Sequence, residues 1–166
     1  MQATDTLTEV KQYYQQSTCQ CEDCRWMCHT PCWGTPDEIK VLMDKYPLDY
    51  FRLGFYSHDY KGISHEFTVI CPKKKKSEDI SDTYLGIDSC IFMNKSGNCV
   101  LHNKKLKPIE GRFAHHTRAD RGQNKHTLRL LVAKSWETEQ GKELVHDFVL
   151  KTKYSAEQWY YDYINQ

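Results

Sequence analysis

The sequence has no long apolar run, little net charge and no apparent leader segment. No stretch of its 166 residues approaches the roughly 20 apolar residues of a membrane-spanning helix, so we expect no membrane insertion. The opening residues, MQATDTLTEVKQYY, contain neither the basic nor the apolar part of a secretory signal, and we therefore expect a cytoplasmic protein. The formal charge is only +1 and no basic stripe is visible, so nucleic acid is not an expected partner. The sequence identifies no other partner.

Internal repeats and low-complexity tracts are also missing. The hydrophobic content of 39% and aromatic content of 13% are typical of a globular protein and exclude a disordered one. We predict one domain over residues 1–166, with a metal-binding core at about 19–116 and a helical C-terminal part at about 124–166.

The basic run Lys73–Lys76 is interpreted as a solvated loop, with a phosphate-binding patch as the alternative.

The clearest local signal is a helix start at Thr35. Thr35 can cap the helix, Pro36 suits its first position, and Glu38 completes a capping box. The helix is expected to continue toward Tyr46 and to end before Pro47.

The other local signals predict an α+β, mainly helical fold with a short β-hairpin and C-terminal helices. The segment FTVIC at 67–71 favours a strand, and residues 72–82 favour a loop. The predicted hairpin pairs residues 88–92 with 98–102 across a Lys95-Ser96-Gly97 turn. Helices are predicted near 7–16, 128–132 (with a strand as the alternative), 144–149 and 155–163, and the aromatic residues of the last one are expected to pack in the core.

Cysteines are what this chain has in excess. Five of the eight fall within residues 19–32, in the pattern C-x-C-x2-C-x3-C-x3-C, and Cys90 and Cys99 form a second pair. The two-residue gap between Cys21 and Cys24 allows a turn that directs both sulfurs at one ion. Wider gaps of three residues lead to Cys28 and Cys32, and the predicted hairpin brings in Cys90 and Cys99. We therefore predict metal ligation by Cys21, Cys24, Cys28, Cys32, Cys90, Cys99 and His102, since His102 follows Cys99 at a spacing that permits joint ligation.

The roles of the remaining histidines and cysteines are left open by the sequence. His29, His115 and His116 are either ligands, bases near a metal, or ordinary hydrogen-bonded histidines. Cys71 lies in an apolar strand and is interpreted as a small core residue, whereas Cys19 is an uncertain ligand. In a secreted, processed protein the same cysteines would instead form disulfides.

Zinc and an iron–sulfur cluster both suit these thiols. Zinc takes four thiolate or imidazole ligands in a tetrahedron, and a four-iron cluster takes four thiolates. Few carboxylates lie near the cysteines, which favours a closed, structural zinc site and a binding role. The alternative is a metal-dependent enzyme, redox or modifying, with an open metal position and a nearby histidine.

The segments CEDCRWMCHTPC and CIFMNKSGNCVLHNKKLKPIEGR resemble the CxxCxxCC, or YkgJ-like, family of zinc- or iron-chelating proteins. The resemblance covers about residues 21–112 and implies metal chelation without implying a particular activity. In it, Pro108 and Arg112 match the closing motif, and His102 stands where the family often has tyrosine. The family usually has cysteine immediately before that arginine, whereas this chain has Gly111.

Overall fold

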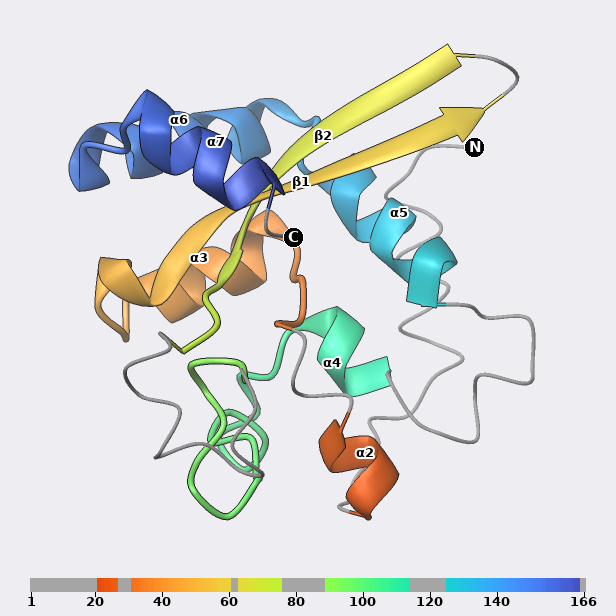
Figure 1. The fold of residues 1–166 in the computed structure, drawn as a ribbon, viewed down its shortest axis with the longest axis vertical. Coiled ribbons are helices and arrows are strands. Elements are labelled where there is room, and N and C mark those ends of the chain that lie inside the picture. Colours follow the sequence, from red (N-terminus) through yellow and green to blue (C-terminus); the bar gives the residue numbers. More distant parts are fainter. Residues whose placement is uncertain (1–20, 27–30, 61–62, 76–88, 114–124, 165–166) are drawn as a thin grey trace.

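The computed structural model describes residues 21–26, 31–60, 63–75, 89–113 and 125–164. Within these ranges a two-stranded antiparallel sheet is combined with helices, which confirms the α+β class (Figure 1). The strands are β1 (Phe51–Tyr60) and β2 (Ile63–Pro72). The helices are α2 (Glu22–Trp26), α3 (Pro36–Met43), the 3-10 helix η2 (Leu48–Tyr50), α4 (Ile109–Phe113), α5 (Lys125–Ser135), α6 (Glu139–Thr152) and α7 (Ala156–Ile164).

The hairpin of β1 and β2 is the central element. Helices α6 and α5 both contact β2, and α7 packs on β1 (Figure 1). In Figure 1 the short helix α4 lies below the hairpin and α2 lies lower still, away from α6 and α7. None of the helices in the described part of the chain is long and apolar enough to cross a bilayer.

Both faces of the hairpin carry buried side chains. On one face Phe51 and Leu53 of β1 are buried, and the register pairs Leu53 with Ile70 and Phe51 with Pro72. On the other face the buried residues of β2 are Phe67, Val69 and Cys71. The predicted strand at 67–71 is thus confirmed as the second half of β2, and Cys71 is confirmed as a fully buried core residue.

One apolar cluster joins the hairpin to α3, α4, α5 and α6. Its members are Trp33, Ile39, Leu42, Phe51, Leu53, Phe67, Val69, Ile70, Cys71, Cys90, Phe92, Leu101, Ile109, Val132, Ala133, Trp136 and Phe148. Burial of such side chains stabilises a fold by roughly 1.5–3 kcal/mol each. The C-terminal helices therefore share a core with the cysteine-bearing segments.

The predicted helix start at Thr35 is confirmed. The Thr35 side chain accepts from the N–H of Glu38, Glu38 caps the backbone of Thr35 in return, and Pro36 is the first helical residue. The helix ends at Met43, slightly earlier than predicted. C-terminal helices are confirmed at 125–135, 139–152 and 156–164, so the segment around Leu131 is helical rather than a strand. The predicted helix at 7–16 lies outside the described residues.

Two predictions about local packing need correction. The aromatic side chains of α7 do not pack in the core, because Trp159, Tyr160, Tyr161 and Tyr163 are 43–61% exposed. Their burial is limited because α7 meets β1 mainly through Phe55, whose ring contacts Trp159 and Tyr163. The turn at 94–98 forms, with Gly97 at φ 73°, but only isolated bridges flank it (Lys74 to Cys90 and Met93 to Cys99) in place of a regular hairpin.

Gly141 offers a test of how α6 joins the core. A methyl group there would lie 2.5 Å from the carbonyl oxygen of Trp136 and 2.7 Å from its Cα, and backbone atoms cannot rotate away. Gly141→Ala is expected to lower the free energy of unfolding by at least about 2 kcal/mol, as overpacking does. Urea denaturation measures this, with the exposed neighbour Lys142→Ala as the control, expected within about 0.5 kcal/mol of wild type. Equal stability of the two variants would contradict the packing described here.

Candidate metal centre

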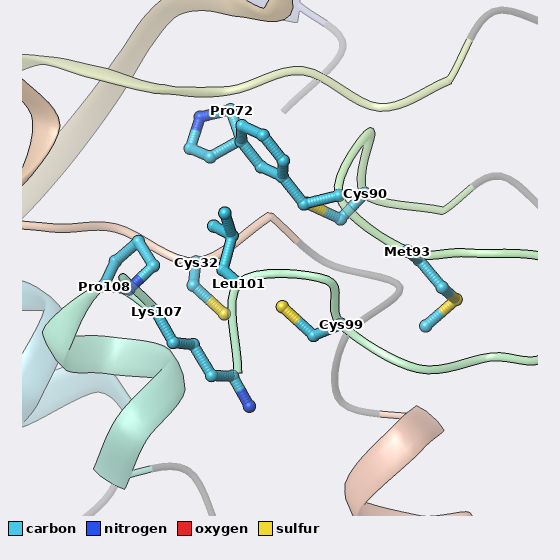
Figure 2. Close-up of a pocket in the computed structure, with 9 residues that line it drawn as sticks. Cys32, Pro72, Cys90, Met93, Cys99, Leu101, Lys107 and Pro108 are labelled. Carbon is cyan, nitrogen blue, oxygen red and sulfur yellow. The ribbon is translucent and has the colours of Figure 1, made fainter. Parts of the chain in front are cut away.

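Three of the predicted ligands line one small cavity. Cys32, Cys90 and Cys99 surround a space of about 20 Å³, together with apolar side chains such as Phe92 and Leu101. In Figure 2 the sulfurs of Cys32 and Cys99 point toward the same space from different segments. A volume of this size holds one water molecule or one ion. The chain therefore brings cysteines from its first and second clusters to the same cavity.

Cys32 is held in place through its neighbour Trp33. The N–H of Trp33 donates to Glu110 Oε2 at 2.6 Å, and the N–H of Glu110 donates to the carbonyl of Trp33 at 3.2 Å. The Nε of Arg129 donates to Glu110 Oε1 at 3.1 Å, and its guanidinium group lies 4.6 Å from the ring centre of Trp33. Because Glu110 is only 2% exposed, this ion pair fixes the segment after Cys32 to α4 and α5.

A second polar cluster holds the start of α4. The carboxylate of Glu38 accepts from the N–H groups of Thr35 and Ile109, at 3.2 and 3.0 Å, and forms an ion pair with Arg112. Glu110, which lies two positions before Arg112 in α4, pairs instead with Arg129. The contacts of Glu38 with Ile109 and Arg112 thus connect the start of α3 to α4.

Gly111 lies directly against the Cys32 sulfur. A Cβ atom at position 111 would be 2.8 Å from Cys32 Sγ and 2.9 Å from Cε of Lys107. A side chain at this position would collide with Cys32, so glycine leaves room for the Cys32 sulfur.

Cys90 and Cys99 are placed by backbone hydrogen bonds that extend from β2. The N–H of Lys75 donates to the carbonyl of Ser89, and that of Ile91 donates to Lys73, which holds the strand-like residues around Cys90 beside the end of β2. Asn94 then closes the turn, because its Oδ1 accepts from the N–H groups of Ser96 and Asn98. This turn reverses the direction of the chain, so that Cys99 faces the cavity.

A larger pocket adjoins the small cavity and shares Cys99 and Lys107 with it. It has a volume of about 370 Å³ and also contains Cys24, from α2, and His102. Burial lowers the pKa of His102 below its ordinary value of 6.5, and the charge of Lys107 lowers it further. A neutral imidazole near neutral pH is the form that binds a metal or accepts a proton.

The remaining predicted ligands are less well connected. Cys21 precedes α2, where its carbonyl accepts from the N–H of Arg25, and it lines neither of the two pockets. Cys28, together with His29, His115 and His116, lies outside the described residues. Within the described ranges, no three cysteine, histidine or acidic side chains are arranged so that they could hold one metal ion.

Sequence reasoning missed the residues that position the site. Glu110, Arg129 and Trp33 form its most buried polar contact, and Trp136 Nε1 adds a bond of 2.9 Å to the carbonyl of Gly34. A charged residue inside the apolar surroundings of Ile109 was a weak signal, but its partner lies 19 residues away in another helix.

Comparison of the chain with protein families, with curated proteins and with solved structures finds no match.

Proposed function

We propose that this protein binds one zinc ion through Cys24, Cys32, Cys90 and Cys99, and that the bound ion has a structural role in a binding protein. The observation that carries the proposal is the convergence of Cys32, Cys90 and Cys99 on one small cavity. Cys90 and Cys99 follow Cys32 by 58 and 67 positions, and thiols of distant segments seldom gather without a common ligand or a common core. Cys24 is the nearest candidate for the fourth position, because it lines the adjoining pocket with Cys99.

The donor set suits zinc better than an iron–sulfur cluster. A cavity of about 20 Å³ has room for one ion, whereas a cluster of four irons and four sulfides needs a much larger space. Thiolate sulfur is a preferred zinc ligand, and four such ligands complete a structural tetrahedron. An iron–sulfur cluster remains the alternative cofactor and would require the loop around Cys99 to move outward.

The ligands of this proposal are not assembled in advance, since the described residues form no ready set of three. Closure of the site would draw Cys24 and Cys99 toward Cys32 and Cys90. Lys107, which borders both pockets, supplies a positive charge that favours thiolate over thiol. Ligation would then tie α2 to the loop at 89–107, and the binding energy would become folding energy.

This reading agrees with the predicted resemblance to the YkgJ-like chelating proteins and with a cytoplasmic location, where thiols stay reduced. The fold that results is a small cysteine-rich core joined to C-terminal helices.

A second function is favoured by His102. Its pKa is lowered by burial, and it borders a pocket of about 370 Å³ beside Cys99. A metal held by three thiolates beside this pocket would keep one position open for water or substrate, with His102 as a ligand or base. That arrangement belongs to a metal-dependent enzyme.

Metal content and visible absorption of the protein purified without oxygen test the proposal. We expect a colourless protein with one zinc per chain. A brown protein that contains iron and sulfide would show that the bound group is an iron–sulfur cluster and not zinc. A redox function would then be favoured. A protein that contains neither metal, and whose thiols have paired as disulfides, would contradict the proposal.

A further inference from the structure

The pocket of about 370 Å³ has a strongly one-sided charge. Its lining contains Arg25 from α2 and Lys104 and Lys107 from the loop before α4, and no aspartate or glutamate is among the described residues that line it. The whole chain carries a formal charge of only +1, so three cations around one pocket are a local concentration. Fields of this kind attract anions, and low-dielectric walls strengthen them.

A pocket on another face shows that this is not a general property of the surface. It has a similar volume, about 420 Å³, and lies between α3 and α6. There Lys40 and Lys151 are accompanied by Asp44, Glu143 and Asp147, so that positive and negative charges nearly cancel. The two pockets therefore differ in charge and not in size.

The uncharged polar groups of the cationic pocket also favour an anion. Asn94 already uses its side-chain oxygen to accept from Ser96 and Asn98, so the group that it can still offer is its NH₂ donor. Asn98 and Asn103 add further amides to the lining. Together with the three cations, these NH₂ donors match the oxygens of a phosphate or a carboxylate.

The side chain of Lys104 is held in position by a neighbouring residue. Its ammonium group donates to the hydroxyl of Tyr46 at 3.1 Å and lies 5.4 Å from the centre of that ring. A lysine ammonium has three donors, so two remain for a ligand. This contact with Tyr46 reduces the entropy that binding would otherwise cost.

We propose that this pocket binds a small multiply charged oxyanion, such as a phosphate- or dicarboxylate-bearing molecule, beside Cys99 and His102. The volume lies at the lower end of the range for small-molecule sites, which suits a ligand of modest size. The inference goes beyond the zinc proposal, because the charges of Arg25, Lys104 and Lys107 do not depend on a metal.

Isothermal titration calorimetry of the full chain tests this, with inorganic phosphate and succinate as separate probes and with zinc-loaded and metal-free protein compared. We expect saturable binding of at least one probe that weakens as sodium chloride is added. The probe that binds more tightly identifies the phosphate or the carboxylate as the recognised group.

Lys104→Gln and Arg25→Gln, from the loop before α4 and from α2, are each expected to weaken that binding about tenfold, the loss typical of one charged hydrogen bond. Lys40→Gln in the mixed-charge pocket is the matched control and is expected to leave it unchanged. Melting temperatures of all three variants report whether folding is preserved.

Two results would overturn the inference. One is that neither probe binds at a concentration of about 10 mM, because a specific site for a dianion would be occupied at that concentration. The other is a loss of zinc affinity in Lys104→Gln and Arg25→Gln without any anion binding, which would assign these cations to the thiolates alone. Neither result tests the zinc proposal, which depends on the metal content and absorption of the protein.

Discussion

Cys99→Ala is expected to lower the affinity for zinc by more than about 100-fold, because residues that only orient a ligand already cost 10–100-fold when they are replaced. Cys99 borders both pockets and is the residue through which Cys24 on one side and Cys32 on the other would share an ion. Its removal would leave too few sulfurs for a closed tetrahedron. Competition with a chromophoric chelator measures the affinity.

Cys71→Ala is the matched control for that experiment. Cys71 is fully buried in β2 and lines neither pocket, whereas Cys99 is partly buried. Its loss removes one sulfur from the core and is expected to leave one zinc bound with wild-type affinity. If Cys99→Ala and Cys71→Ala bind zinc equally well, Cys99 is not a ligand and the proposed site is wrong.

Glu110→Gln is expected to give the largest loss of stability among the ionisable residues described here. Removal of one member of a buried ion pair leaves the other uncompensated, at a cost of about 3–5 kcal/mol. Arg129 retains 21% of its side-chain exposure, so we expect the lower end, about 3 kcal/mol. For a chain of this size that corresponds to a melting temperature roughly 6–12 °C lower.

The amide at position 110 would also affect the metal centre. Glutamine can accept from the N–H of Trp33 or from Arg129, but its NH₂ group cannot replace the second acceptor. The segment that carries Cys32 would then be held less firmly, and zinc affinity is expected to fall together with stability.

Glu143→Gln on the exposed surface of α6 makes the same chemical change without a buried partner, and we expect it within about 0.5 kcal/mol of wild type. Addition of Arg129→Met to Glu110→Gln is expected to cost less than the sum of the two single changes, because the unpaired cation is removed. Thermal and urea unfolding measure all of these variants. Equal stability of Glu110→Gln and Glu143→Gln would contradict the buried network.

Local signals in the sequence predicted the local structure well. The capping box at Thr35 and Glu38 depends on residues three positions apart, and its helix is confirmed. The apolar run at 67–71 is confirmed as part of β2. β1 gave no comparable signal, because Gly54, Ser57 and Asp59 interrupt its alternation, and its partner strand rather than its own composition holds it extended.

Contacts between residues far apart in the sequence could not be predicted from local sequence patterns. The bonds of Glu38 to Arg112 and of Trp33 to Glu110 join residues 74 and 77 positions apart, and no local spacing encodes them. The grouping of Cys32 with Cys90 and Cys99 was predicted from residue type alone, since soft thiols in two clusters suggest one ligand. The apolar strand around Cys71 had already indicated a core residue, and its full burial confirms this.

X-ray absorption at the zinc edge tests the central claim most directly, because it reports the type and distance of the atoms around the bound ion. The proposed site predicts a shell of four sulfurs at about 2.3 Å. Three sulfurs with one nitrogen or oxygen would instead favour the open site beside His102. A shell of nitrogen and oxygen only would contradict zinc binding by the clustered cysteines.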